Sequence, residues 1–418
     1  MLVTTKLLEG AMRPVRTSLR TSLGVVAAAA LLLAACSDGG DTTPAESSTS
    51  TSTIKIGAIV PFEGQTASLG KSFLEAVRVS IDNLGDTKHD YQLVVEDGGT
   101  TPAESERAAR RLIQEDGADA IVGGISAVGR LVAPIATEAK VPHICICSIP
   151  TIGDGQYNFT NIPLAADEAE AWVAEAKSRG LQTIAILAQS YPSIDGHIAA
   201  VKAAAEQAGM KVVYEYRFPA GTTKFLKPMM AAGEKQPDVY FVEAYEPSLT
   251  DVGEQIRVAE KVHGRPLEVA SSVAISISQD LRTFEGAWYT DSDLANDAVL
   301  AQFRQAYPSS EFITHMMPYA YDSVRMLVDG FESDQGVIDY LRNLTSYDGS
   351  AGPITRAAGS GNFRSKPVVW VIKDGRPEVE ASGRTFADPA AANNPDTPPA
   401  TSEPANPHAP TTTTTTAG

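Results

Sequence analysis

The chain has 418 residues, and 34 Lys and Arg against 51 Asp and Glu give a formal net charge of −17. This acidic balance argues against a nucleic-acid partner, which requires a basic face, and the length favours two domains over one. Three cysteines and six histidines argue against a disulfide framework and a histidine-rich metal site. We therefore expect no metal and no cofactor.

Residues 1–36 have the order of an export signal. Three arginines precede an apolar run of 13 residues at 23–35, which is too short to span a bilayer of roughly 30 Å. The run closes on Leu-Ala-Ala-Cys, which resembles the bacterial lipobox, in which the cysteine becomes lipidated. Cys36 would then anchor the protein to the cell membrane outside the cytoplasm by lipid alone. A plain secretory signal with an accidental cysteine is the alternative.

Both ends of the chain carry segments that cannot bury an apolar core. Ten of the 17 residues at 37–53 are Ser or Thr, a composition typical of a flexible tether. Residues 388–418 are rich in Pro, Ala, Asn and Thr, and we interpret them as a disordered tail. The segment at 54–387 remains to be folded.

Within this segment, short apolar runs alternate with helical patterns. Strands of four to eight residues between helices of ten or more predict βαβ units, a parallel sheet and an α/β fold. The expected strands are residues 54–60, 91–96, 120–122, 143–148, 183–187, 211–216, 239–243, 267–271, 286–290 and 368–372. The expected helices are residues 70–84, 103–114, 128–138, 166–177, 194–208, 224–232, 249–262, 294–306 and 315–331.

The strands fall into two groups, which predicts two Rossmann-like lobes, each with a parallel central sheet. The first group runs over 54–148 and the second over 183–271, and the stretch at 149–163 has no helical period and is expected to cross between them. Open α/β sheets bind ligands at the carboxyl ends of their strands. A ligand cleft is therefore expected between the lobes.

Several short motifs resemble one known family, in the same order along the chain. They are Ile-Lys-Ile-Gly at 54–57, Val-Glu-Asp-Gly at 95–98, Val-Pro at 141–142, Pro-Asp-Val-Tyr-Phe at 237–241 and Tyr-Glu-Pro at 245–247. Together they resemble the leucine/isoleucine/valine-binding type of the periplasmic-binding-protein-like fold, the type I substrate-binding proteins of ABC transporters.

The resemblance implies an exchange of parts between the lobes through a three-segment hinge. Lobe one would be 54–161 plus 273–349, and lobe two 162–272 plus 350–387. A ligand that contacts both lobes would favour the closed state.

The resemblance also implies a function. A monomeric solute-binding lipoprotein would capture an amino acid or related small molecule and deliver it to an ABC permease. The alternative is a sensory or scaffold lipoprotein of the same fold. No nucleophile motif or carboxylate dyad is evident, so no catalytic residue and no enzyme activity are expected.

The loop at 123–129 is the first candidate site, because it follows a strand and opens a helix. Free N–H groups at a helix N-terminus suit a carboxylate, and the Ser126 hydroxyl adds a donor beside Ala127. A simple N-cap role for Ser126 is the alternative. Arg130 stands where a Walker A loop has lysine, which argues against an NTPase.

Further candidates follow other strands. The family places small hydroxyl residues after the fourth strand, which makes Ser148 the counterpart here, and Cys145 and Cys147 before it are expected to be buried free thiols. Tyr191 and Tyr245 follow two lobe-two strands, where a ring covers apolar ligand and a hydroxyl donates. Ordinary loop packing is the alternative for both tyrosines.

One departure from the family concerns charge. Amino-acid binders of this family carry a lobe-two carboxylate for the ligand ammonium, and this chain has Ser272 in that region. A buried ammonium without a counter-charge is costly. Glu243 or Glu246 from the neighbouring strand end, or Glu63 from the first loop, are the candidate substitutes.

Overall fold

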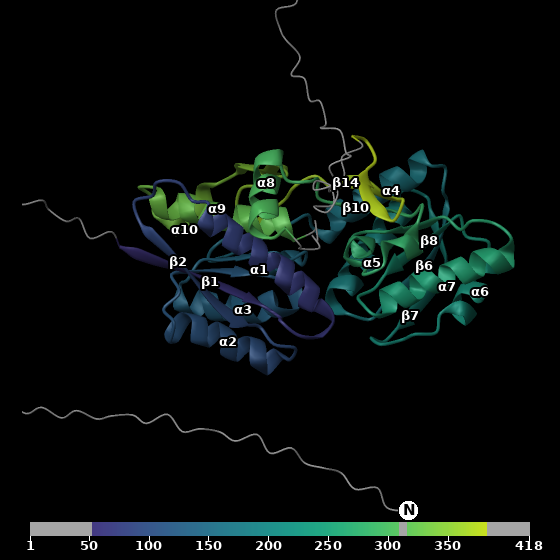
Figure 1. Ribbon diagram of the computed structural model, residues 1–418, viewed down its shortest axis with the longest axis horizontal. Coiled ribbons are helices and arrows are strands. Elements are labelled where there is room, and N and C mark those ends of the chain that lie inside the picture. Colours follow the sequence, from purple (N-terminus) through teal and green to yellow (C-terminus); the bar gives the residue numbers. More distant parts are fainter. Residues whose placement is uncertain (1–51, 309–315, 383–418) are drawn as a thin grey trace, which may run out of the picture. The chain divides into compact units, whose positions relative to one another are not determined.

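The computed structural model describes residues 52–308 and 316–382, in which helices alternate with strands (Figure 1). The expected signal segment with Cys36, nearly all of the tether and the tail at 388–418 lie outside the described residues. The helices are α1 (Ala67–Asp82), α2 (Pro102–Gln114), α3 (Ser126–Ala139), α4 (Ala165–Ser178), α5 (Pro192–Gln207), α6 (Leu226–Gly233), α7 (Ser248–His263), α8 (Asp297–Ala306), α9 (Met317–Glu332) and α10 (Val337–Asn343).

The strands confirm the predicted α/β class, with two mostly parallel sheets and one small antiparallel pair formed by β11 and β12. They are β1 (Thr53–Val60), β2 (Asp90–Asp97), β3 (Ala120–Gly123), β4 (His143–Cys145), β5 (Asn158–Asn161), β6 (Thr183–Gln189), β7 (Lys211–Phe218), β8 (Val239–Glu243), β9 (Val269–Ser271), β10 (Trp288–Asp291), β11 (Ser346–Gly349), β12 (Gly352–Thr355), β13 (Asn362–Phe363), β14 (Val368–Lys373) and β15 (Arg376–Val379).

The first sheet is wholly parallel and has the order β13-β5-β4-β3-β1-β2. Gly57 of β1 lies opposite Val94 of β2 and Ile121 of β3. Helix α1 packs against α8 and α9, and α2 packs against α3. Right-handed crossovers place these two groups on opposite faces of the sheet. Coverage of both faces explains why β3 is buried along its whole length.

The second sheet has the order β15-β14-β10-β9-β8-β6-β7. Strands β6 to β10 pair in parallel, and β14 and β15 extend the β10 side as antiparallel strands. Trp172 of α4 stacks on Trp288 of β10 with ring centroids 5.5 Å apart. Both indoles are fully buried, so this aromatic pair fixes α4 on the sheet.

The chain passes between the sheets after β5, after β10 and after β13, which gives the three crossings expected from the resemblance. The predicted lobe boundaries are wrong at two places. Strand β10, assigned to lobe one within 273–349, pairs with β9 in the second sheet, and β13, assigned to lobe two within 350–387, pairs with β5 in the first. An apolar strand pattern does not specify which sheet edge its backbone will join.

Strand β5 lies inside the stretch at 149–163 that was expected to cross between the lobes. Its polar residues are buried because they have tertiary partners: the Asn161 side chain donates to the Tyr319 carbonyl and to Ser323 Oγ, both at 3.1 Å. Asn158 Nδ2 donates to Thr137 Oγ1 at 2.7 Å. Hydropathy cannot reveal a strand whose burial depends on such distant partners.

Local signals fix several helix ends. Helix α2 begins with a capping box, in which the Thr101 side chain accepts from the Glu104 N–H and the Glu104 carboxylate accepts from the Thr101 N–H. Gly180, Gly209 and Gly264 follow α4, α5 and α7 with φ of 77°, 77° and 67°, the left-handed conformation that glycine adopts readily after a helix. No helix among the described residues is both long and apolar enough to cross a membrane.

Candidate ligand-binding site

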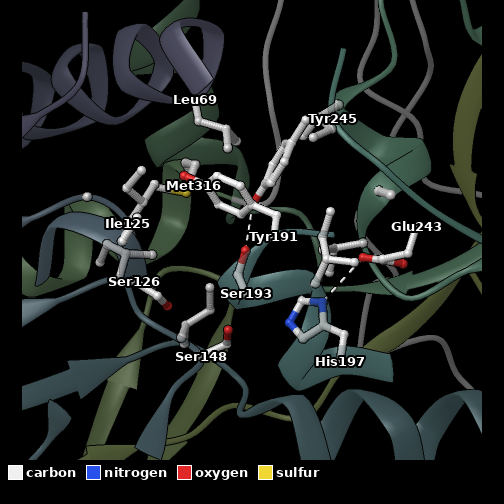
Figure 2. A pocket seen from close by; sticks show the side chains of 18 of the residues that line it. Leu69, Ile125, Ser126, Ser148, Tyr191, Ser193, His197, Glu243, Tyr245 and Met316 are labelled. Atoms are coloured by element: carbon white, nitrogen blue, oxygen red, sulfur yellow. Dashed lines mark hydrogen bonds and ion pairs between the residues drawn. The ribbon is translucent and has the colours of Figure 1, made fainter. Parts of the chain in front are cut away.

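A cavity of about 50 Å³ lies at the carboxyl ends of strands from both sheets (Figure 2). A water molecule needs roughly 10–15 Å³ by this measure, so the cavity suits a small solute and not a peptide. Most of its wall is apolar, which favours a solute with a hydrocarbon body. The apolar side chains include Leu69, Ile125, Ile146, Ile194, Ile277 and Met316.

The N-terminus of α3 forms one wall of the cavity. Ile125, the N-cap residue, is extended and offers no side-chain acceptor to the first-turn N–H groups. Ser126 and Ala127 line the cavity, and Ser126 is buried. The open N–H groups, the positive helix end and the Ser126 hydroxyl together make this wall suitable for an anion.

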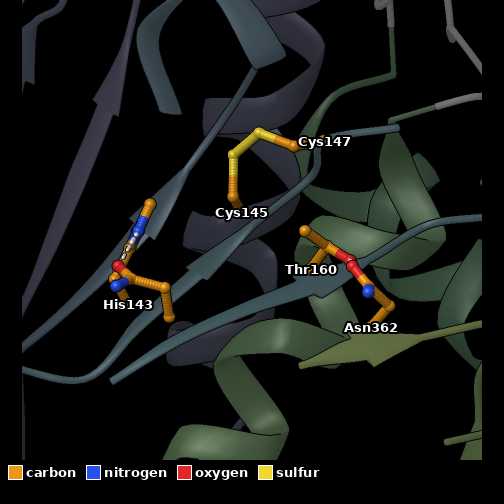
Figure 3. Close-up of a disulfide and its surroundings, with 6 residues drawn as sticks. His143, Cys145, Cys147, Thr160 and Asn362 are labelled. Atoms are coloured by element: carbon orange, nitrogen blue, oxygen red, sulfur yellow. Dashed lines mark hydrogen bonds between the residues drawn. A yellow bond between two sulfur atoms is a disulfide. The ribbon is translucent and has the colours of Figure 1, made fainter. Parts of the chain in front are cut away.

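Ser148 lies on the same side of the cavity as Ser126 (Figure 2). Strand β4 ends at Cys145, and the chain then bends, so that the Cα atoms of Cys145 and Cys147 are 5.1 Å apart and the two residues form a disulfide (Figure 3). The expectation of free thiols, which assumed a strand extended through 148, is therefore wrong in this structure. Gly129 of α3 packs on both sulfur atoms and leaves no room for a Cβ.

Two tyrosines from the second lobe cover the cavity. The rings of Tyr191 and Tyr245 meet edge to face, with centroids 5.1 Å apart, and the Tyr245 hydroxyl is 2.9 Å from Ser193 Oγ. Burial raises the pKa of Tyr245 above its usual value, so the hydroxyl stays protonated and able to donate. Gln189 connects this group to the first lobe: it accepts from the Tyr245 N–H at 3.0 Å and donates to Gln65 Oε1 at 2.9 Å.

Buried ionisable groups form another part of the wall. Glu243, the last residue of β8, lines the cavity beside His197 of α5. His197 Nδ1 lies 3.2 Å from Glu243 Oε1, and His197 Nε2 lies 3.3 Å from Glu168 Oε2 of α4. The Ser272 N–H donates to Glu243 Oε2 at 3.1 Å. Burial, reinforced by the nearby carboxylates, raises the pKa of Glu168 to about 8 although His197 opposes the shift.

Comparison with a model of the family described as "Periplasmic binding protein" gives a match over residues 53–375. The chain belongs to the periplasmic binding protein family. This is a family of solute-binding proteins and not of enzymes, as the resemblance implied. A search of curated proteins finds no match.

Solved structures of similar fold include other binding proteins. A leucine-binding protein LivK from Thermotoga maritima has a TM-score of 0.69 at 20% identity, covering 78% of this chain and 97% of that one. LivJ from Streptococcus pneumoniae in complex with isoleucine has 0.69 at 18%, covering 78% and 98%. A Rhodopseudomonas palustris solute-binding protein in complex with 4-hydroxybenzoate has 0.69 at 22%, covering 78% and 95%. These identities establish a shared fold alone.

The binding protein brings five of the eight predicted ligand residues to the cavity. These are Ser126, Ala127, Ser148, Tyr191 and Tyr245. Their contact with ligand stays a prediction.

The other three lie elsewhere. Ser272 is buried behind Glu243, and Glu63 is exposed in a neighbouring groove. The Glu246 carboxylate accepts from the Thr250 N–H, the Thr250 hydroxyl and the Gln279 N–H at 3.1, 2.8 and 2.7 Å, so it holds two chain segments together away from the cavity.

Sequence reasoning missed the polar residues of α5. Ser193 and His197 are four positions apart, which places them on one face of the helix that follows Tyr191. This spacing, read together with the strand end before it, is the signal that would have indicated a second row of cavity residues. Glu168 has no such signal, because only tertiary packing brings α4 next to His197.

Replacing Ser126 by Ala and Tyr245 by Phe together is expected to weaken solute binding by about ten- to a hundredfold, because each change removes a hydroxyl at the cavity, at roughly 1 kcal/mol or more per hydrogen bond. Isothermal titration would measure the loss. The melting temperature should stay within a few degrees of the wild-type value. Unchanged affinity would show that the cavity is not the binding site.

Proposed function

We propose that this chain is an extracytoplasmic solute-binding lipoprotein that captures a small amino acid between two closing lobes and delivers it to an ABC importer. The observation that carries the proposal is the pairing of an anion-binding helix end with a buried carboxylate on the wall of one apolar cavity. A zwitterion with a hydrocarbon side chain complements all three features.

The solute carboxylate would bind at the N-terminus of α3. There it would accept from the first-turn N–H groups and from the Ser126 hydroxyl, with Ser148 close by. The helix dipole adds a favourable interaction with the negative charge. Binding of the solute carboxylate at this wall does not require a Lys, Arg or His side chain.

The solute ammonium would pair with Glu243. This carboxylate is buried and lines the cavity, so an approaching cation would meet little solvent screening. Glu243 comes from the end of β8, one strand away from the position after β9 where amino-acid binders of this family carry a carboxylate and this chain has Ser272. A charge of opposite sign for each end of the zwitterion avoids an unpaired buried ion.

Closure would follow from the solute touching both lobes. Ser126 belongs to the first lobe and Tyr245 to the second, so only the closed state lets one small molecule contact both. Differential affinity for that state shifts the population towards it. The Gln65–Gln189 hydrogen bond would add to the closed state because it joins the same two lobes.

An aromatic or aliphatic acid without an ammonium group is the second candidate class. The edge-to-face tyrosine pair and the apolar wall suit an aromatic ring, and a structure of this fold is in complex with 4-hydroxybenzoate. The complex of LivJ with isoleucine supports the amino acid.

A thermal-shift screen of the secreted chain carrying Cys36→Ser would separate these classes. The ligands are isoleucine, leucine, 4-methylpentanoate (leucine without its ammonium group) and 4-hydroxybenzoate. A solute at about 100 times its Kd adds roughly 2.7 kcal/mol of stability, which moves the melting midpoint by several degrees. We expect the amino acids to give the larger shift. A shift with the acids alone favours the second class, and no shift with any ligand favours the sensory or scaffold role.

The lipid anchor has its own test. Replacing Cys36 by Ser removes the thiol that would carry the lipid, so the protein is expected to move from the membrane fraction to the soluble extracytoplasmic fraction with its ligand affinity unchanged. Fractionation and the mass of the mature N-terminus would measure this. Equal membrane retention of both forms would contradict lipidation at Cys36.

A further inference from the structure

Three buried side chains form a continuous row that ends at the cavity. Glu168 of α4 contacts His197 of α5 at 3.3 Å, and His197 contacts Glu243 of β8 at 3.2 Å. The two contacts use opposite nitrogens of the imidazole, Nε2 and Nδ1. All three side chains are buried, and Glu243 and His197 alone of the three line the cavity. Glu168 therefore acts on a solute only through His197.

The row constrains where protons reside. If His197 Nδ1 carries the proton, it donates to Glu243 Oε1, and Nε2 then accepts and needs a donor. A protonated Glu168, whose Oε2 lies 3.3 Å from Nε2, would supply that donor. Burial raises the pKa of Glu168 to about 8, so its carboxyl is protonated at neutral pH. Transfer of this proton to His197 leaves the total unchanged, so the row carries one net negative charge in either form.

Resting on the proposed function, we propose that Glu168 and His197 are positioning residues for Glu243, which together aim its carboxylate at the solute ammonium and set the charge of the site to minus one. The Ser272 N–H, which donates to Glu243 Oε2, fixes the second oxygen. With both oxygens held, the carboxylate needs no reorganisation when a cation arrives.

Other ionisable groups also face the row. Asp291 of β10 and Glu243 raise the pKa of Glu168, and the tyrosine hydroxyls of Tyr245 and Tyr319 are within its electrostatic reach. Among the described residues, no cluster of His, Cys, Asp and Glu is arranged to hold a metal ion. Asp291 and the two tyrosines are acidic or neutral neighbours, which makes a cation the complementary partner of the row.

The test compares two substitutions of Glu168 by their effect on selectivity. The quantity is the ratio of affinities for leucine and for 4-methylpentanoate, measured by titration calorimetry at pH 7 on the secreted chain carrying Cys36→Ser. Glu168→Gln keeps a neutral donor towards Nε2 and should keep the ratio within about threefold. Glu168→Leu removes the donor and should lower the ratio at least about tenfold, with the affinity for 4-methylpentanoate unchanged. Glu170→Gln, an exposed position on the same helix, is the matched control.

A second variant keeps the test decisive if Glu168→Leu folds poorly. His197→Asn retains a donor for Glu243 without the ring nitrogen that faces Glu168. In this background, Glu168→Gln should leave the ratio unchanged at pH 7, because the hydrogen-bonded connection between the two carboxylates is cut. Melting curves recorded for each variant separate a folding defect from a change in selectivity.

The pH profile distinguishes positioning from packing. As pH rises from 7 to 9, Glu168 loses the proton that it would donate to His197 Nε2 and the row gains a second negative charge, so the leucine ratio should change with pH in the wild type and stay flat in Glu168→Gln. A wild type that does not prefer leucine overturns the proposed function and this inference with it. A wild type that prefers leucine, with the same ratio in Glu168→Leu or the same pH profile in Glu168→Gln, overturns the inference alone.

Discussion

Glu243→Gln is expected to weaken the binding of an amino acid by at least about thirtyfold, because loss of one partner of a buried ion pair costs roughly 2–5 kcal/mol. The solute ammonium would lose its counter-charge, whereas the carboxylate end at α3 would be untouched. Affinity for 4-methylpentanoate should therefore change little. Titration calorimetry with both ligands measures the difference.

Glu246→Gln is the comparison that makes this result specific. Glu246 is also buried and lies three residues further along the chain, but its carboxylate accepts from Thr250 and Gln279 and does not line the cavity. We expect its replacement to change affinity by less than about threefold. If Glu246→Gln abolished amino-acid binding and Glu243→Gln retained it, the carboxylate that pairs with the solute ammonium would have been assigned to the wrong residue.

Glu168→Gln is expected to stabilise the ligand-free protein in alkaline solution. The folded state raises the pKa of Glu168 from 4.5 to about 8, so it binds the proton more tightly than the unfolded chain does. The stability that this proton contributes is complete below pH 4.5 and is lost as pH rises through 8. Glutamine stays neutral, so the variant should exceed the wild type at pH 9 by an amount on the order of a few kcal/mol.

Urea unfolding at pH 5, 7 and 9 would measure the effect as a difference between the two proteins, so that all other titrating groups cancel. The difference should be near zero at pH 5 and grow with pH. Glu170→Gln should show no such trend, because its side chain is exposed. A constant difference at all three pH values would mean that Glu168 is ionised throughout and that His197 holds it as an ion pair.

Much of the site was predictable because it follows strand ends. Ser126, Tyr191 and Tyr245 each come shortly after an apolar strand whose boundaries the sequence shows well, and parallel sheets bring such positions to one edge. The period of the hydrophobic pattern was therefore enough to place them. It was not enough for Ser148, whose cavity position depends on a bend after Cys145.

The buried row of Glu168, His197 and Glu243 shows what the sequence could not reveal. Glu168 lies in the first turn of a helix, where a glutamate is ordinarily exposed and favourable to the helix dipole. Its burial arises because α4 and α5 pack together over the second sheet and bring it against His197. Such a contact between separate helices leaves no local pattern. The same holds for β10 and β13, whose sheet membership depends on which edge was open.

The three crossings also determine when the molecule can fold during synthesis. The first lobe takes its last strand from Asn362–Phe363, and the second takes β14 and β15 from Val368–Lys373 and Arg376–Val379. Neither lobe is complete until almost the whole folded segment has emerged, because each waits for its C-terminal strands. A nascent chain in this condition stays without a finished core for longer than one built from sequential domains.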